Sequence, residues 1–241
     1  RLGGMNYLSA GDVNEGIKGW NDMMEDLATS AGYSVEGEAK LVHLGFDLGG
    51  DIIVNFTPQI GIGVGTGYIH GAKTSEVTYS NSGEGSWTNK PKISAIPIRF
   101  GVFYTLPMGD AMNVVLNVGA GLYLAKFSYN WRIEENGSWN EVNQDASATG
   151  FGLHGGIGFE FELAPNIAFV LEAQGRYAKI GGFEGTMDQR DSGGWSDEED
   201  GTLYYWEVNS YSFVFVQEDE PSGAGVSNVR EAKVDFSGIT F

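Results

Sequence analysis

The feature that most constrains the fold of this chain is an alternation of apolar residues with small or polar residues at a period of two. Between positions 42 and 56 the second set consists mostly of glycine, aspartate, histidine and asparagine. A period of two places the two sets on opposite faces of a β-strand. The apolar face is formed by Val42, Leu44, Phe46, Leu48, Gly50, Ile52, Val54 and Phe56. This segment is therefore predicted to be one long amphipathic strand.

The same alternation recurs along the chain and predicts eight strands in a single domain, residues 1–241. The further strands are expected at 5–8, 60–68, 96–104, 114–124, 151–161, 167–177 and 232–241. Short connections are expected at 57–59, 107–110 and 164–166. Long connections are expected at about 10–40, 74–92, 132–148 and 181–230. An up-and-down arrangement puts alternate connections at opposite ends, so one rim carries short turns and the other carries long loops.

The size of such a barrel decides which way the apolar faces point. An eight-stranded barrel has an interior just wide enough for its own side chains. The apolar faces are too bulky for it, because they contain Phe46, Phe56, Phe100, Phe151, Phe159, Phe161 and Phe169. The glycine-rich faces suit a crowded interior instead. The chain is therefore predicted to be all-β, an eight-stranded antiparallel up-and-down transmembrane β-barrel, rather than a soluble carrier with an apolar interior.

Composition excludes several other classes of protein. No apolar run approaches the roughly 20 residues that a membrane-spanning helix needs. The formal net charge of −18 repels phosphate backbones, so nucleic acid is not expected as a partner. The chain contains no cysteine, which excludes disulfides and thiolate metal ligands.

The chain resembles the small outer-membrane barrels of the OmpA-transmembrane-domain and OmpX-like group. The resemblance rests on the eight-strand alternation, on short turns opposite long loops, and on a last strand, 232–241, that ends in phenylalanine. It implies a bacterial outer-membrane location with extracellular loops, surrounded by outer-membrane lipid. In that family such an end resembles the recognition signal for the barrel-assembly machinery, a role that falls on Phe236 and Phe241. These two residues have opposite parity, and a bulge at Gly238 would restore the alternation.

Charged residues occupy the face predicted to point into the barrel. The carboxylates are Asp47, Asp51, Glu160, Glu162, Glu172 and Asp235, and the bases are Arg99, Arg176 and Lys233. Because an isolated buried charge is costly, these groups are expected to pair into a salt-bridged plug. Two alternatives stay open, a narrow gated conduit and carboxylates with a catalytic role.

No sequence pattern assigns a metal, a cofactor or an enzymatic site. His43 and His154 share the inward face, but no His, Asp or Glu residues show the spacing of a recognised metal-ligand motif. No nucleophile elbow or comparable motif is present. The chain is therefore expected not to be an enzyme. The resembled family does include lipid-acyl enzymes and proteases.

The first long connection carries a helical pattern. Apolar residues recur at helical spacing, and they are Ile17, Trp20, Met24 and Leu27. Asp12 is predicted to cap this short helix and Gly32 to end it. The helix is expected to cover the barrel mouth, with a partner-binding surface as the alternative.

The six tryptophans lie in or beside the long connections. Trp is enriched at binding hot spots, and loops need no Trp for solubility. Contact with a partner is assigned to Trp20, Trp87, Trp139, Trp195 and Trp206. Packing of the loops against one another is the alternative, and the same alternative applies to Trp131.

The last long connection contains two acidic segments, 196–200 and 217–220, with an alternating aromatic stretch, 203–216, between them. The alternation predicts a hairpin that rises beyond the membrane, and its aromatic face needs cover from the first-loop helix or from another protein. The acidic segments are expected to be solvated. Calcium binding is the alternative, because hard cations take several carboxylate oxygens.

The predicted function is that of a non-enzymatic outer-membrane barrel. Its acidic, aromatic-rich loops would serve adhesion, envelope integrity, or assembly with a protein partner or with further copies of the chain. The first alternative is a narrow porin-like channel. The second is a lipid-modifying enzyme.

Overall fold

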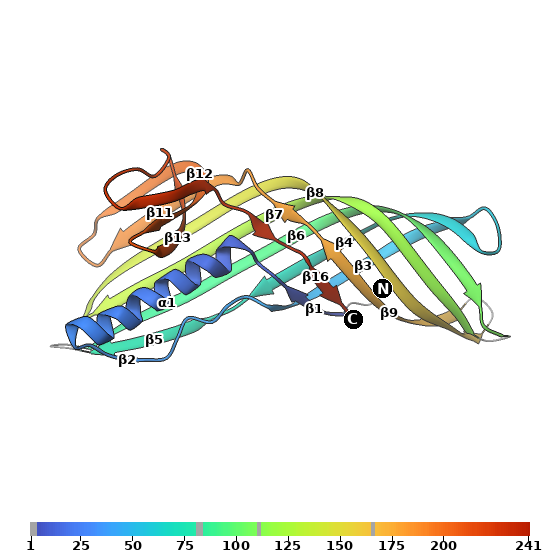
Figure 1. The fold of residues 1–241 in the computed structure, drawn as a ribbon, viewed down its shortest axis with the longest axis horizontal. Helices are drawn as coiled ribbons and strands as arrows, with labels where there is room; N and C mark the ends of the chain where they lie inside the picture. Colours follow the sequence, from blue (N-terminus) through green and yellow to red (C-terminus); the bar gives the residue numbers. More distant parts are fainter. Residues whose placement is uncertain (1–3, 81–83, 110–111, 165–166) are drawn as a thin grey trace.

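The computed structural model describes residues 4–80, 84–109, 112–164 and 167–241, and shows an elongated molecule made mostly of antiparallel strands (Figure 1). The period-two alternation and the many β-branched and aromatic residues favour extended chain in these segments. The helix is α1 (Asp12–Ala31). The strands are β1 (Gly4–Leu8), β2 (Ser34–Glu36), β3 (Leu44–Asn55), β4 (Ile60–Ala72), β5 (Ser75–Ser80), β6 (Glu84–Pro107), β7 (Met112–Glu135), β8 (Ser138–Ala164), β9 (Ile167–Tyr177), β10 (Lys179–Ile180), β11 (Glu184–Asp191), β12 (Ser196–Val208), β13 (Tyr211–Gln217), β14 (Val226–Glu231), β15 (Val234–Asp235) and β16 (Gly238–Thr240).

Within the described residues, eight of these strands pair in a closed cycle, which we call the ring. The order is β1, β3, β4, β6, β7, β8, β9 and β16, each antiparallel to the next. β16 then pairs with β1, with Asn6 opposite Thr240 and Leu8 opposite Gly238. Every ring strand therefore has a partner on both sides, which removes the free edges of an open sheet.

The ring strands differ greatly in length. β3, β4 and β9 contain 12, 13 and 11 residues, whereas β6, β7 and β8 contain 24, 24 and 27. A 24-residue strand spans about 80 Å at about 3.3 Å per residue. Figure 1 shows β6, β7 and β8 running along most of the molecule, far beyond β3, β4 and β9.

The projecting halves of β6, β7 and β8, together with α1, β2, β5 and β11 to β14, form a second region that we call the head. β5 pairs with β6, and β2 pairs with β5. On the other side β11 pairs with β8, β12 with β11, and both β13 and β14 pair with β12. In Figure 1 the head lies at the end of the molecule opposite to the β3–β4 turn.

The structure has 16 strands where the alternation predicted eight. Two segments predicted as loops, 74–92 and 132–148, are mostly strand and belong to β5, β6, β7 and β8. The prediction was wrong because the polar and apolar faces exchange sides along these strands, as described below. The two-residue turn Asn136–Gly137 joins β7 to β8, with φ of 50° and 82° as a type I′ hairpin requires.

The helix occurs where it was predicted, but its first turn differs from the prediction. Asp12 does not cap α1, since the N-cap is Gly11 and no side chain caps it. The Asp12 carboxylate instead accepts hydrogen bonds from the guanidinium of Arg230 and from the backbone N–H of Lys233, the latter at 2.7 Å. The hydrogen bond to Asp12 is the main cause of a raised pKa at Arg230. Gly32 ends the helix in the left-handed conformation, as predicted.

The hairpin predicted between positions 203 and 216 is present as β12 and β13. Its turn is Asn209–Ser210, both at positive φ. Val214 and Val216 are buried, and α1 provides the cover that the sequence required of a helix or a partner. Gly19 of α1 lies so close to β13 that a Cβ there would overlap the backbone of Ser212.

The C-terminal segment is broken rather than continuous. β15 pairs with β10, whereas β16 pairs with β1 and β9, and Phe236–Ser237 lies between them. The break resolves the parity conflict seen in the sequence, because Phe236 is fully buried while Phe241 is 67% exposed. The irregularity thus falls two residues before the predicted bulge at Gly238.

The first predicted short turn lies at the end of the molecule away from the head. Thr57, Pro58 and Gln59 connect β3 to β4 there (Figure 1). Asp110, Pro165 and Asn166, predicted for the other two turns, lie outside the described residues. In the described part of the chain, no helix is long and apolar enough to cross a membrane.

We expect Gly19→Ala to destabilise the head even though alanine is the better helix former. Helix propensity alone would stabilise α1 by about 1 kcal/mol. The added methyl must displace the Ser212 backbone, and overpacking of this kind costs about 1–3 kcal/mol. Protease susceptibility of the head and near-ultraviolet circular dichroism measure the change. Lys18→Ala, on the exposed side of the same turn, is the matched control, and a stabilised Gly19→Ala variant would contradict the close packing.

Candidate functional site: the ring interior, the outward belt and the head

The outward face of the ring is strongly apolar, and we call it the belt. All of the exposed large apolar side chains except Leu27 and Trp195 lie on ring strands or directly beside them. Examples are Phe151 at 80% exposed and Ile52 at 74%. Monomeric proteins in water rarely expose a continuous apolar surface larger than a few hundred Å². The belt therefore requires an apolar environment around the ring.

The belt ends abruptly toward the head. On the outward face of β7, Val118 and Leu124 are followed by Lys126, Ser128 and Asn130. The register places Lys126 opposite Ser94 of β6 and opposite Ser147 of β8. The change from apolar to polar thus occurs at the same level on three neighbouring strands.

The inward face changes from polar to apolar at about the same position along the strands. On the ring side of this level it carries polar residues such as Arg99 and Asn117, both buried. On the head side it carries Trp87, Ile93 and Phe127, each at most 1% exposed. The strands are therefore polar inside and apolar outside in the ring, and apolar inside and polar outside in the head.

Arg176 of β9 lies at the centre of the ring interior and is almost completely buried. Its Nη1 donates to Asp47 Oδ2 at 3.1 Å, and its Nη2 donates to Asn6 Oδ1 at 3.1 Å. Its Nε donates to the carbonyl oxygen of Phe236 at 2.8 Å. Thr240 also donates to Asp47 Oδ2, at 3.3 Å. The guanidinium thus links β9 with β1, with β3 and with the segment before β16, and Asp47 adds the contact with Thr240 of β16.

A second group of polar side chains lies in the ring around Arg99 of β6. Arg99 is 3.5 Å from Asp51 and donates to Gln174 at 3.4 Å. Gln174 donates to Asn117 at 3.3 Å, and Asn117 donates to Glu172 at 2.7 Å. These contacts connect the predicted residues Asp51, Arg99 and Glu172 across four ring strands.

The remaining residues of the predicted charge network lie elsewhere. Glu160 accepts a hydrogen bond from Asn113 at 2.9 Å. The side chain of Glu162 lies outside the described part. Asp235 is in β15, 3.7 Å from Lys179, and Lys233 directly precedes β15. Lys233 and Asp235 therefore lie near the start of α1 instead of on a ring strand, because the chain leaves the ring before β16.

Apolar side chains fill the interior where the ring meets the head. Leu8, Val42 and Ile93 converge on Gly71, whose position would place a Cβ within 4 Å of all three side chains. Ile69 and Phe236 belong to the same buried cluster. The five side chains are at most 1% exposed. We call them the apolar plug.

The tryptophans assigned to partner contact have different surroundings. Trp20 of α1 lies 5.5 Å from Trp87 and 5.8 Å from Trp131, measured between ring centroids. Trp206 stacks on Phe213 at 6.0 Å. Trp87 is 1% exposed and cannot touch a partner, because it is part of the core of the head. The assignment was wrong for Trp87, since the sequence could not show that β6 buries this face.

Trp139 and Trp195 remain at the surface of the head. The guanidinium of Arg132 lies 4.5 Å from the Trp139 ring. Trp195 is 49% exposed, in the turn between β11 and β12. Their contact with a partner stays a prediction.

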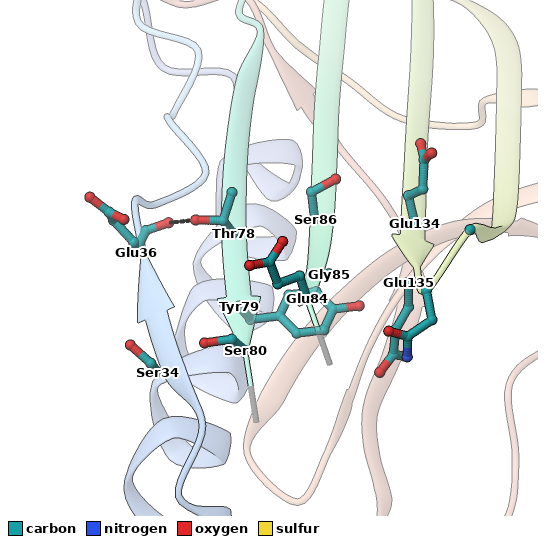
Figure 2. Close-up of a pocket in the computed structure, with 12 residues that line it drawn as sticks. Ser34, Glu36, Thr78, Tyr79, Ser80, Glu84, Gly85, Ser86, Glu134 and Glu135 are labelled. Atoms are coloured by element: carbon teal, nitrogen blue, oxygen red, sulfur yellow. Dashed lines mark hydrogen bonds between the residues drawn. The ribbon is translucent and has the colours of Figure 1, made fainter. Parts of the chain in front are cut away.

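A cleft of about 760 Å³ lies at the far tip of the head (Figure 2). It is bordered by β2, β5 and the β6 and β7 ends, and it is acidic. Its carboxylates are Glu36, Glu84, Glu134 and Glu135. Burial, followed by the charge of Glu135, raises the pKa of the Tyr79 phenol in this cleft. Sequence reasoning did not find the cleft, because the carboxylates are brought together only by the pairing of four strands.

Among the described side chains, no group of three or more His, Asp and Glu residues is arranged to hold a metal ion. His43 Nδ1 is 3.1 Å from the carbonyl oxygen of Leu8, and His154 is buried in the ring. Calcium at the acidic segments stays a prediction.

One family model matches the chain, and it covers residues 5–200. Its description is "Outer membrane protein beta-barrel domain". Searches of curated proteins and of solved structures gave no significant match.

We expect Arg176→Met to destabilise the ring by about 3–5 kcal/mol, because it leaves the Asp47 carboxylate buried without its cation. The temperature at which the folded form is lost in detergent electrophoresis measures the effect. The double variant Arg176→Met with Asp47→Asn should recover part of the loss. Arg132→Met, at an exposed ion pair, is the control and should cost at most about 1 kcal/mol. Equal effects of the two arginine variants would contradict the central role of Arg176.

Proposed function

The chain belongs to the family of outer membrane protein β-barrel domains, and from this membership we propose that its ring is an eight-stranded transmembrane barrel that holds the head outside the cell as a rigid binding platform. The function of the platform would be adhesion, envelope integrity or assembly with a protein partner. The proposal includes no enzymatic step.

The observation that carries the proposal is the exchange of polarity at one level of the sheet. A transmembrane strand needs about 9–11 residues. β9, with 11 residues, and β3, with 12, meet this length, whereas β6, β7 and β8 are at least twice as long. The extra length carries the inward apolar, outward polar pattern of a folded domain in water. Strands that pass without interruption from one pattern to the other support rigid display of a folded head.

The apolar plug and the buried ion pairs argue against the porin-like alternative. A conducting path would have to cross the layer around Gly71 as well as the Arg176–Asp47 pair. The ion pair lies inside the ring, the plug lies where the ring meets the head, and the five plug side chains are at most 1% exposed. The lumen is therefore proposed to be a structural element and not a conduit.

The head supplies the surfaces for recognition. Trp139 and Trp195 with the acidic cleft lie outside its core, at the end farthest from the belt. The net charge of −18 favours a partner with positive groups. Calcium at the acidic segments 196–200 and 217–220 would be an accessory to such a contact.

The test compares the full chain with a variant that lacks residues 184–220. None of the ring pairings uses these residues, so both proteins should show the heat-dependent mobility of a folded barrel. Neither should give steady openings in planar bilayers. Cross-linking on intact cells should recover a specific partner with the full chain and lose it with the deletion.

Steady openings of the full chain would overturn the non-conducting proposal in favour of the channel. Equal partner recovery with the deletion variant would show that the function does not reside in this part of the head. A deletion variant that fails to assemble would make β11 to β13 structural elements of the barrel.

A further inference from the structure

A groove of about 390 Å³ lies on the outward face at the level where the belt ends. Its cationic side is formed by Lys92 of β6 and Lys126 of β7, with Ser94, Ser128 and Ser147 around them. Directly on the ring side of this level the outward face carries Ile96 and its cross-strand partner Leu124. The groove is thus the first polar surface beyond the belt.

The two lysines are positioned to act together. Lys92 is opposite Ser128 and Lys126 is opposite Ser94, so the lysines are diagonal neighbours on adjacent strands. Such neighbours are about 7–8 Å apart at the backbone, which long side chains easily span. Both are exposed, and within the described chain they belong to none of the ion pairs.

The remaining groups in the groove limit the ligand chemistry. Asp145 and Glu184 border it on the β8 and β11 side. Asp145 accepts a hydrogen bond from Ser128 at 2.7 Å, and this bond uses part of the hydrogen-bond-accepting capacity of the carboxylate. The donors that remain are the two ammonium groups and the hydroxyls of Ser94 on β6 and Ser147 on β8. A compact anion with several acceptor oxygens, such as a phosphate group, fits this set of donors.

The surroundings of the groove identify the source of such a phosphate. Lys90 lies on the same face of β6, and the backbone of Lys73 donates to Pro91 at 3.1 Å, so two more lysines lie close by. The chain has 14 basic and 32 acidic residues, and this concentration of lysine next to the belt is therefore unusual for it. Basic residues at the edge of a membrane-spanning surface attract anionic lipid head groups.

We propose that the groove around Lys92 and Lys126 binds the phosphorylated head group of a lipid whose acyl chains lie against Ile96, Leu124 and Phe151. The proposal rests on the membrane position of the belt under the proposed function. It adds a specific lipid site at the edge of the belt, and this site would fix the height and tilt of the head above the bilayer.

The experiment uses the full chain in phosphatidylcholine nanodiscs, with a diacyl lipid carrying a phosphomonoester head group as the probe. Native mass spectrometry after release should show the phosphomonoester lipid retained in preference to phosphatidylcholine. The double variant Lys92→Ala with Lys126→Ala should weaken retention about thirtyfold, from two lost lysine contacts. Lys92→Arg with Lys126→Arg should retain the lipid. Lys90→Ala, on the same strand face but outside the groove, is the matched control and should weaken retention far less than the double variant does.

The outcomes separate this inference from the proposed function. Failure of the chain to enter nanodiscs would contradict the membrane barrel itself. A chain that enters nanodiscs but binds the lipid equally well with or without the two lysines would overturn only the lipid site. Inorganic phosphate that competes fully at the concentration of the lipid would also overturn it, since the acyl chains would then contribute nothing.

Discussion

The structure depends on the pairing of β1 with β16, because this pairing turns a long sheet into a ring. In hydrocarbon an unpaired backbone N–H or C=O has no water to bind, so a spanning sheet must close. The closing strands are short, and Asn6 lies opposite Thr240 at one end of their pairing. Arg176 stabilises this closure from inside, since it binds Asn6, Asp47 and the Phe236 carbonyl. A buried ion pair of the ring, Arg176–Asp47, therefore lies where the ring is joined.

Closure also explains why the same strands can build two kinds of domain. Inside the ring, polar side chains hydrogen-bond to one another, as Arg176 does with Asp47 and Asn6, and the apolar side chains point outward. Beyond the ring the sheet opens, and α1 with β13 fills the space that the inward side chains now face. Trp20, Trp87 and Trp131 form the core there as they would in a water-soluble protein. The lysines of the groove lie between these two regimes, which under the proposed function is where a bilayer meets water.

The sequence predicted β3, β4, β9 and the ring parts of β6, β7 and β8, because a single rule, apolar residues outward, holds along them. It missed the break before β16. The rule failed beyond Leu124, where Lys126 occupies an outward position and Phe127 an inward one. The alternation continues there, but the apolar residues now point inward and the polar residues point outward. A rule that expects apolar residues outward therefore predicts a loop in this segment. Asn136–Gly137 was the available clue, since this dipeptide favours a tight hairpin between strands. The ion pairs Arg176–Asp47 and Arg99–Asp51 depend on strand register, which alternation alone does not specify. The burial of Trp87 depends on a helix packed from another part of the chain.

The most direct test of this account measures where β7 passes from lipid to water. The chain has no cysteine, so single cysteines can be placed at Val118, Leu122, Leu124, Lys126, Ser128 and Asn130 and labelled with a nitroxide. In lipid nanodiscs, the account predicts that oxygen relaxes the labels at 118, 122 and 124 more than a water-soluble nickel complex does. It predicts the reverse at 126, 128 and 130. Labels at 118–124 that the nickel complex reaches freely, or oxygen preference that continues to 130, would contradict the exchange of polarity at one level.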